Sequence, residues 1–119
     1  MDKRTLENYC LKHIGVSHNY KEEWNADRYL VGGKIFAIIG EDPKEGKPLI
    51  TLKNDPNQIE ALREKYEGVI PGYFMHKVHW NSYFFDASIP DNLWEELIDQ
   101  SYELVYRRLS KKIKEEISV

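Results

Sequence analysis

Residues 28–39 read RYLVGGKIFAII, and this stretch decides what kind of fold the chain can adopt. Two β-prone runs, Arg28 to Val31 and Lys34 to Ile39, flank the pair Gly32-Gly33. Two glycines between such runs predict a β-hairpin, because glycine tolerates the positive φ angles of a tight turn. The stretch therefore predicts an antiparallel sheet.

The residues before this hairpin predict one helix and then an irregular segment. The helix is expected from about residue 3 to 13, with Gly15 suited to end it. Val16 to Asn25 is polar and irregular, with Trp24 as its expected anchor. The side chains that recur at helical spacing are Leu6, Tyr9, Cys10, His13 and Ile14.

The residues after the hairpin alternate between strands and helices. Pro48 to Lys53 predicts a third strand, and Asp55-Pro56 carries the signals that open a second helix, which Gly68 ends. Gly68 to Phe85 is dense in aromatic and β-branched residues and predicts two more strands, with a turn near residues 76–78. A third helix begins near residues 88–91 and is expected to run past Leu109.

The predicted order is α-β-β-β-α-β-β-α. Hairpin-connected strands between helices favour an α+β fold, a mostly antiparallel sheet with helices packed on it. At 119 residues the chain is expected to form a single domain, residues 1–119.

Composition restricts the environment and the class of partner. The chain has one cysteine, no signal-peptide pattern and no apolar run longer than Ile35 to Ile39, so we expect a cytoplasmic protein that does not enter membranes. The formal net charge of −3 does not favour a protein that coats DNA. Charge is segregated, however: Phe84 to Tyr106 holds six acids and no base, and Arg107 to Lys114 holds five bases and no acid.

No constellation of residues predicts catalysis. Cys10 lies at the apolar spacing of the first helix, where a buried thiol is expected, and His76 and His79 lack the further ligands that zinc needs. We therefore predict a protein that is not an enzyme, with no cofactor and no metal site.

The segment from His76 to Asn81 combines side chains that suit nucleic acid. Lysine and histidine can contact phosphates, asparagine can pair with a base edge, and tryptophan can stack on a base. The alternative is a packed β-hairpin with Trp80 in the core.

The chain resembles the MmcQ/YjbR family of small bacterial proteins from about Arg4 to Lys111. The resemblance implies a CyaY-like fold with a double-wing arrangement, and members are described as DNA-binding proteins on structural similarity. The fragments that carry the resemblance are Tyr9-Cys10-Leu11 with Gly15-Val16, VGGKIFA at 31–37, Leu52-Lys53 with Asp55-Pro56, YEGVIPGY at 66–73, MHKVHWNS at 75–82, and Pro90 to Leu109 with Ser101-Tyr102.

The resemblance also implies which residues form the site. Among the shared positions, Gly33, Phe36 and Pro71 are expected to be structural. His76 and Val78 depart from the pattern, because the family often has asparagine and lysine there, and the second change removes a positive charge. The expected nucleic-acid-binding residues are Lys34, Lys53, Lys77, His79, Trp80 and Asn81.

The residues and the resemblance together suggest three functions. The first is weak, salt-sensitive binding of duplex DNA by a monomer. The second is a protein-interaction module that uses the aromatic face of Tyr73, Phe74 and Trp80. The third is frataxin-like metal binding on the acidic ridge of the third helix, formed by Asp91, Glu95, Asp99 and Glu103.

Overall fold

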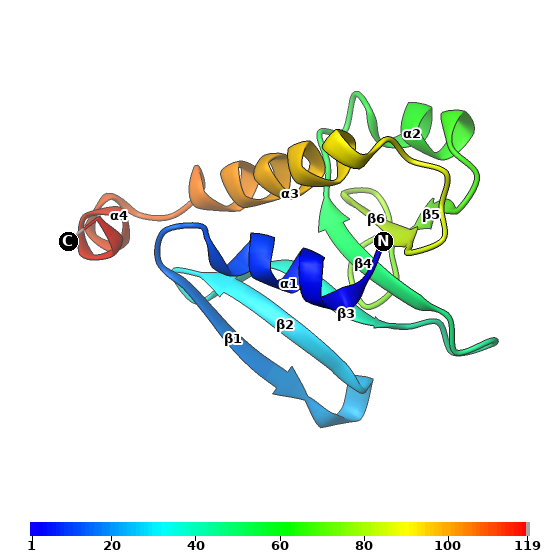
Figure 1. Cartoon of the computed structure of the whole chain (residues 1–119). Coiled ribbons are helices and arrows are strands. Elements are labelled where there is room, and N and C mark those ends of the chain that lie inside the picture. Colours follow the sequence, from blue (N-terminus) through cyan, green and yellow to red (C-terminus); the bar gives the residue numbers. More distant parts are fainter. Residues whose placement is uncertain (119) are drawn as a thin grey trace.

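Six strands form one antiparallel sheet in the computed structural model, which describes residues 1–118 (Figure 1). The spatial order is β1-β2-β3-β4-β6-β5. The hairpin predicted around Gly32-Gly33 is confirmed, with Val31 opposite Lys34 across the turn. The strands are β1 (Val16–Lys21), β2 (Ala26–Val31), β3 (Lys34–Glu41), β4 (Pro48–Lys53), β5 (Val69–Pro71) and β6 (Trp80–Phe84).

The helices supply the second layer. Helix α3 contacts β2, β3 and β4, α1 packs against α3 and β1, and α2 contacts β5 and β6 (Figure 1). Trp94, Leu97 and Ile98 of α3 are buried against the sheet, and the predicted α+β class is confirmed. The helices are α1 (Lys3–Leu11), α2 (Ile59–Lys65), α3 (Asp91–Tyr106) and α4 (Lys111–Ile117), with a 3₁₀ turn at Glu22–Trp24. No helix within residues 1–118 is long and apolar enough to cross a bilayer.

The prediction of an irregular segment at residues 16–25 was wrong. Val16–Lys21 is strand β1, paired with β2 over its whole length. The strand forms the edge of the sheet and none of its residues is buried, so its side chains show no alternation of apolar and polar types. Trp24 does anchor the following turn, since its ring stacks on Phe74 with centroids 5.3 Å apart.

The prediction of one helix running past Leu109 was also wrong. Helix α3 ends at Tyr106, and the Ser110 hydroxyl accepts a hydrogen bond from the backbone N–H of Ile113, which caps a separate helix α4. A serine cap starts a new helix because its side chain replaces a missing backbone partner. The observed order is therefore α-β-β-β-β-α-β-β-α-α, with two elements more than predicted.

The second helix starts later than predicted. The Asp55 carboxylate accepts from the N–H of Asn57, and the Asp55 carbonyl accepts from the N–H of Gln58. These bonds close a turn before the helix, which begins only at Ile59.

The C-terminal helix covers the turn of the central hairpin. A Cβ atom built on Gly32 would lie 2.8 Å from side-chain atoms of both Leu109 and Ile113. Figure 1 shows α4 beside the turns that join α1 to β1 and β2 to β3. Two constraints therefore favour glycine at position 32. Its φ of +58° is one that other residues rarely adopt, and the neighbouring side chains leave no space for a Cβ atom.

Gly32→Ala is expected to destabilise the fold by about 2–4 kcal/mol, because it adds strain at positive φ to a steric clash with Leu109 and Ile113. Urea unfolding monitored by circular dichroism measures the change. Gly33→Ala is the matched control: its φ is +79°, but nothing lies within 4 Å of the added atom, so only about 1 kcal/mol is expected. Equal losses in the two variants would contradict the packing of α4 on this turn.

Candidate nucleic-acid interface

Three cations line a cleft of about 530 Å³ between the start of β3, the end of β4 and the end of α3. Lys34, Lys53 and Arg108 supply the positive charge, and no carboxylate is part of the lining. The remaining lining residues are Gly33, Ile35, Met75, Trp80, Val105 and Leu109. A concave, mostly apolar site with a few charged groups is the usual form of a ligand site.

A smaller hollow of about 210 Å³ adjoins this cleft. It shares Lys53 and Arg108 with the larger hollow and adds Arg107 and His79. The two hollows therefore belong to one surface, which we call the basic cleft. Its charged or titratable members are Lys34, Lys53, His79, Arg107 and Arg108.

The cations of the basic cleft form no ion pair with any residue that the structure describes. Within residues 1–118, no ion pair involves Lys34, Lys53, Arg107 or Arg108. Burial, together with the neighbouring charge of Arg108, lowers the pKa of Lys53. Folding thus places Lys53 where its positive charge is disfavoured, and a bound anion would reverse that effect.

The hydroxyl of Ser101 fixes the position of the Lys53 backbone. The Lys53 N–H donates to the hydroxyl of Ser101, 2.9 Å away, and that hydroxyl donates in turn to the carbonyl of Phe36 at 2.5 Å. Ser101 is fully buried in α3. This one side chain therefore ties α3 to β3 and β4, and it brings Lys53 next to the end of α3, which Arg107 and Arg108 follow directly.

A clamp made by Arg63 holds the loop that presents Lys77 and His79. The guanidinium donates to Asn81 Oδ1 at 2.6 Å and to the carbonyl of Lys77 at 2.5 Å. Asn81 also donates through Nδ2 to the carbonyl of Ile59. Asn81 is fully buried, so in this conformation its amide positions the loop and is not presented to a ligand.

The structure gathers four of the six residues expected from the resemblance. Lys34, Lys53 and Trp80 line the larger hollow, and His79 lines the smaller one. Lys77 is exposed on the loop, where its ammonium lies over the Tyr73 ring and outside both linings.

Sequence reasoning did not include Arg107 and Arg108 in the site. The signal was present, because both belong to the block of bases after Tyr106. The sequence pattern did not predict that α3 ends at Tyr106. Because the helix ends there, these two arginines lie beside Lys53.

The aromatic face proposed for a protein partner is largely covered. Trp80 is 6% exposed, and Phe74 stacks on Trp24. Within residues 1–118, the large apolar side chains that are exposed are those of Met1, Leu11, Ile14, Tyr20 and Val78, and Val78 alone among these is close in sequence to the aromatic face.

One carboxylate of the acidic ridge, that of Asp99, is bonded to side chains at residues 9 and 13. Asp99 accepts from the Tyr9 hydroxyl at 2.8 Å and pairs with His13 Nε2 at 2.7 Å.

The ring centroids of His76 and His79 are 5.7 Å apart. Within residues 1–118, no further metal-ligating side chain groups with this pair.

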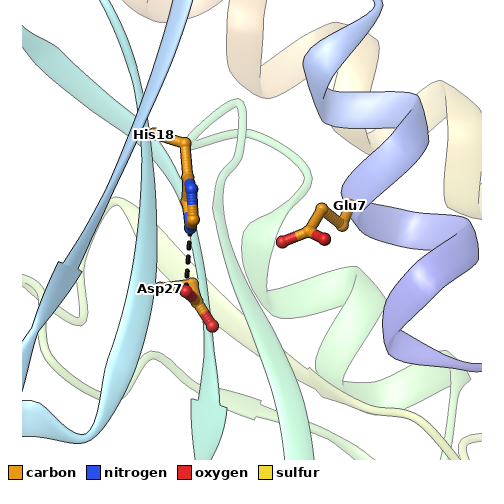
Figure 2. A group of neighbouring side chains, drawn as sticks. All are labelled: Glu7, His18 and Asp27. Atoms are coloured by element: carbon orange, nitrogen blue, oxygen red, sulfur yellow. Dashed lines mark hydrogen bonds and ion pairs between the residues drawn. The ribbon is translucent and has the colours of Figure 1, made fainter.

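Metal-ligand types do gather elsewhere, at Glu7, His18 and Asp27, whose ligand atoms lie within 4.8 Å of one another. Figure 2 shows His18 bonded to Asp27, with Glu7 reaching towards them from α1. The ammonium of Lys3 lies 2.7 Å from Asp27, and the Tyr29 hydroxyl donates to Glu7.

The carboxylates of Glu7 and Asp27 are therefore already bonded to other side chains of the protein. Burial alone would raise the pKa of Asp27, but the hydrogen bonds from Lys3 and His18 outweigh it and hold the pKa below its usual value. The cluster links α1 to the β1–β2 hairpin as a bonded network.

Comparison with known proteins finds relatives along most of the chain. A family model described as YjbR matches residues 11–104. The chain is 32% identical over 98 residues to the protein named "Uncharacterized protein YjbR" of Escherichia coli K12, covering 82% of this chain and 81% of that protein. It is 37% identical over 86 residues to "Uncharacterized protein YbdF" of Escherichia coli O157:H7, covering 72% of this chain and 69% of that protein.

Solved structures share the fold. The crystal structure of Deinococcus radiodurans protein DR2400 matches with a TM-score of 0.83 at 24% identity, covering 98% of this chain and 87% of that chain. A Pseudomonas syringae protein matches with a TM-score of 0.78 at 22% identity, covering 88% of this chain and 99% of that chain. These two likenesses establish the architecture.

Arg63→Ala is expected to destabilise the protein by about 1–3 kcal/mol, because it leaves the buried Asn81 carbonyl oxygen without its donor. Urea unfolding gives the energy, and amide hydrogen exchange at residues 77–80 reports the loosened loop. Lys65→Ala, on the exposed side of the same helix, is the control and is expected to change stability by no more than about 0.5 kcal/mol. Unchanged exchange in Arg63→Ala would rule out the clamp.

Proposed function

This chain belongs to the YjbR family, and we propose that it is a non-enzymatic domain that binds DNA weakly through the basic cleft. The observation that carries the proposal is the set of cations around Lys53 that form no ion pair within residues 1–118. Converging uncompensated cations attract phosphate, because each neutralised phosphate releases condensed counterions from the nucleic acid.

Each part of the cleft has a distinct role in this proposal. Lys34, Lys53, Arg107 and Arg108 neutralise phosphates, and Arg side chains can do so with two parallel hydrogen bonds. Lys77 and His79 extend the contact along the loop. Asn81 acts indirectly, because with Arg63 it sets the position of that loop.

The overall charge of the chain supports weak, salt-dependent binding. The net charge is −3, so the molecule as a whole repels a polyanion, and attraction depends on local groups of cations such as the basic cleft. Five phosphate contacts, one for each lysine and arginine of this site including Lys77, would give a slope of about −4 to −5 in a plot of log affinity against log salt concentration.

The state of the only cysteine supports a non-enzymatic role. Cys10 is fully buried, and burial raises the pKa of its thiol to about 12. A nucleophilic cysteine needs a lowered pKa and access to substrate, and Cys10 has neither.

Arg108→Ala is expected to weaken binding of a duplex roughly threefold to tenfold at low salt and to make the salt slope less steep by about 0.9, because one phosphate contact is lost. Fluorescence anisotropy with a labelled duplex at several salt concentrations measures both quantities. Lys44→Ala, in the loop between β3 and β4, is the matched control and should leave both unchanged. Absence of duplex binding by the parent protein at low salt would defeat the proposal.

Lys53→Met separates function from stability. The pKa of Lys53 is lowered in the folded state, so its charge opposes folding at neutral pH, and a neutral side chain of similar length should keep or raise the free energy of unfolding. The same change should lower DNA affinity by a factor similar to that for Arg108→Ala. A variant that unfolds more easily and binds DNA as before would show that Lys53 is a structural residue.

A further inference from the structure

We propose that the basic cleft holds one nucleotide splayed out of a single strand, so that the protein prefers single-stranded DNA to duplex. The base enters the larger hollow, and its phosphates lie on Lys53 and Arg108. This inference rests on the proposed function and specifies the form of nucleic acid that the same site takes.

The shape of the site is the first argument. A volume of about 530 Å³ lies within the range of pockets that enclose small molecules. A duplex presents a convex backbone with its bases stacked inside, so a hollow of this kind stays largely unfilled against it. A nucleotide that projects from a flexible single strand can fill the hollow with its base.

The chemistry of the hollow is the second argument. Apart from its three cations, its lining residues are apolar, and they include Met75 and the small exposed part of Trp80, 6% of that residue. Aromatic rings and thioethers are favourable partners for the flat face of a base. Phosphate alone would need the cations but would gain nothing from this apolar floor.

The floor is rigid before any ligand arrives. The Trp80 N–H donates to the His76 carbonyl at 3.1 Å, and the Trp80 carbonyl accepts from the Gly72 N–H at 2.9 Å. Gly72 lies so close that a Cβ built on it would fall 2.8 Å from the Cβ of Trp80. A preformed site of this kind loses little conformational freedom on binding.

The smaller hollow extends the argument along the strand. Its volume of about 210 Å³, lined by His79, Arg107, Lys53 and Arg108, suits a phosphate group better than a second nucleotide. Because Lys53 and Arg108 border both hollows, the phosphate of the bound nucleotide lies between them. The neighbouring phosphate of the same strand then falls beside His79 and Arg107.

The three tryptophans provide a direct measurement. Only Trp80 lines the basic cleft, whereas Trp24 stacks on Phe74 and Trp94 lies between α1 and α3. In ¹H–¹⁵N spectra, thymidine monophosphate should shift the Trp80 indole signal and leave those of Trp24 and Trp94 in place. Thymidine and inorganic phosphate should each give smaller shifts at the same concentration. Equal shifts with inorganic phosphate alone would overturn the assignment of the base.

Affinity measurements test the strand preference. A ten-nucleotide thymidine strand should bind about tenfold more tightly than a duplex of ten base pairs at the same salt concentration. It should also bind much more tightly than thymidine monophosphate, because the strand adds phosphate contacts. Monophosphate binding as tight as that of the strand would make this a mononucleotide site and would overturn the inference.

Blocking variants complete the test. Ile35→Trp fills the larger hollow without changing charge, and the ratio of single-strand to duplex affinity should fall towards one. Met75→Trp, which fills it from the loop, serves if the first variant does not fold. Ile14→Trp is the control, since Ile14 is 68% exposed and outside the basic cleft, and it should keep the ratio of the parent.

The results distinguish the two levels of the proposal. Duplex binding that equals or exceeds single-strand binding, with no effect of Ile35→Trp, would overturn the inference and leave the proposed function standing. Failure to bind either nucleic acid at low salt would remove both.

Discussion

The buried hydroxyl of Ser101 is the contact on which the geometry of the basic cleft depends. It donates to the carbonyl of Phe36 in β3 and accepts from the N–H of Lys53 in β4, so one side chain of α3 satisfies backbone groups on two adjacent strands. A buried backbone group without a partner is costly, and this pair of bonds therefore fixes the position of α3 along the sheet. The end of α3 then lies beside the end of β4, and the cleft forms between them.

The positive charges of the basic cleft lower the stability of the folded protein. Lys53 is half-buried near Arg108 and forms no ion pair within the described part of the chain, and its pKa is lowered by burial and by the charge of Arg108. Some lysines elsewhere are arranged in the opposite way: Lys3 pairs with Asp27, and Lys47 pairs with Asp86. Charged groups whose pKa is shifted by burial and by like charges are typical of binding sites. At such a site a bound ligand of opposite charge offsets the unfavourable electrostatic energy.

Much of the fold could be predicted from local sequence. The Gly32-Gly33 hairpin, strand β4 and the two strands around residues 69–84 follow from turn residues and β-branched runs. Strand β1 could not be predicted this way, because an edge strand without buried residues lacks a hydrophobic pattern. The break between α3 and α4 was missed because apolar spacing continues through Leu109 and Ile113, and only the Ser110 cap marks it.

The candidate site was likewise predicted in part from the sequence and in part only visible in the tertiary structure. The sequence by itself determined the chemical types, namely the lysines, His79 and Trp80 within a motif typical of the family, and the block of bases after Tyr106. Only the tertiary structure decided that Arg107 and Arg108 join Lys53, that Lys77 stays outside the two hollows, and that Asn81 is buried under Arg63. Local patterns specify hairpins and helices, because those depend on neighbours in the chain. The cleft depends on a contact between residues 53 and 101, which no local pattern encodes.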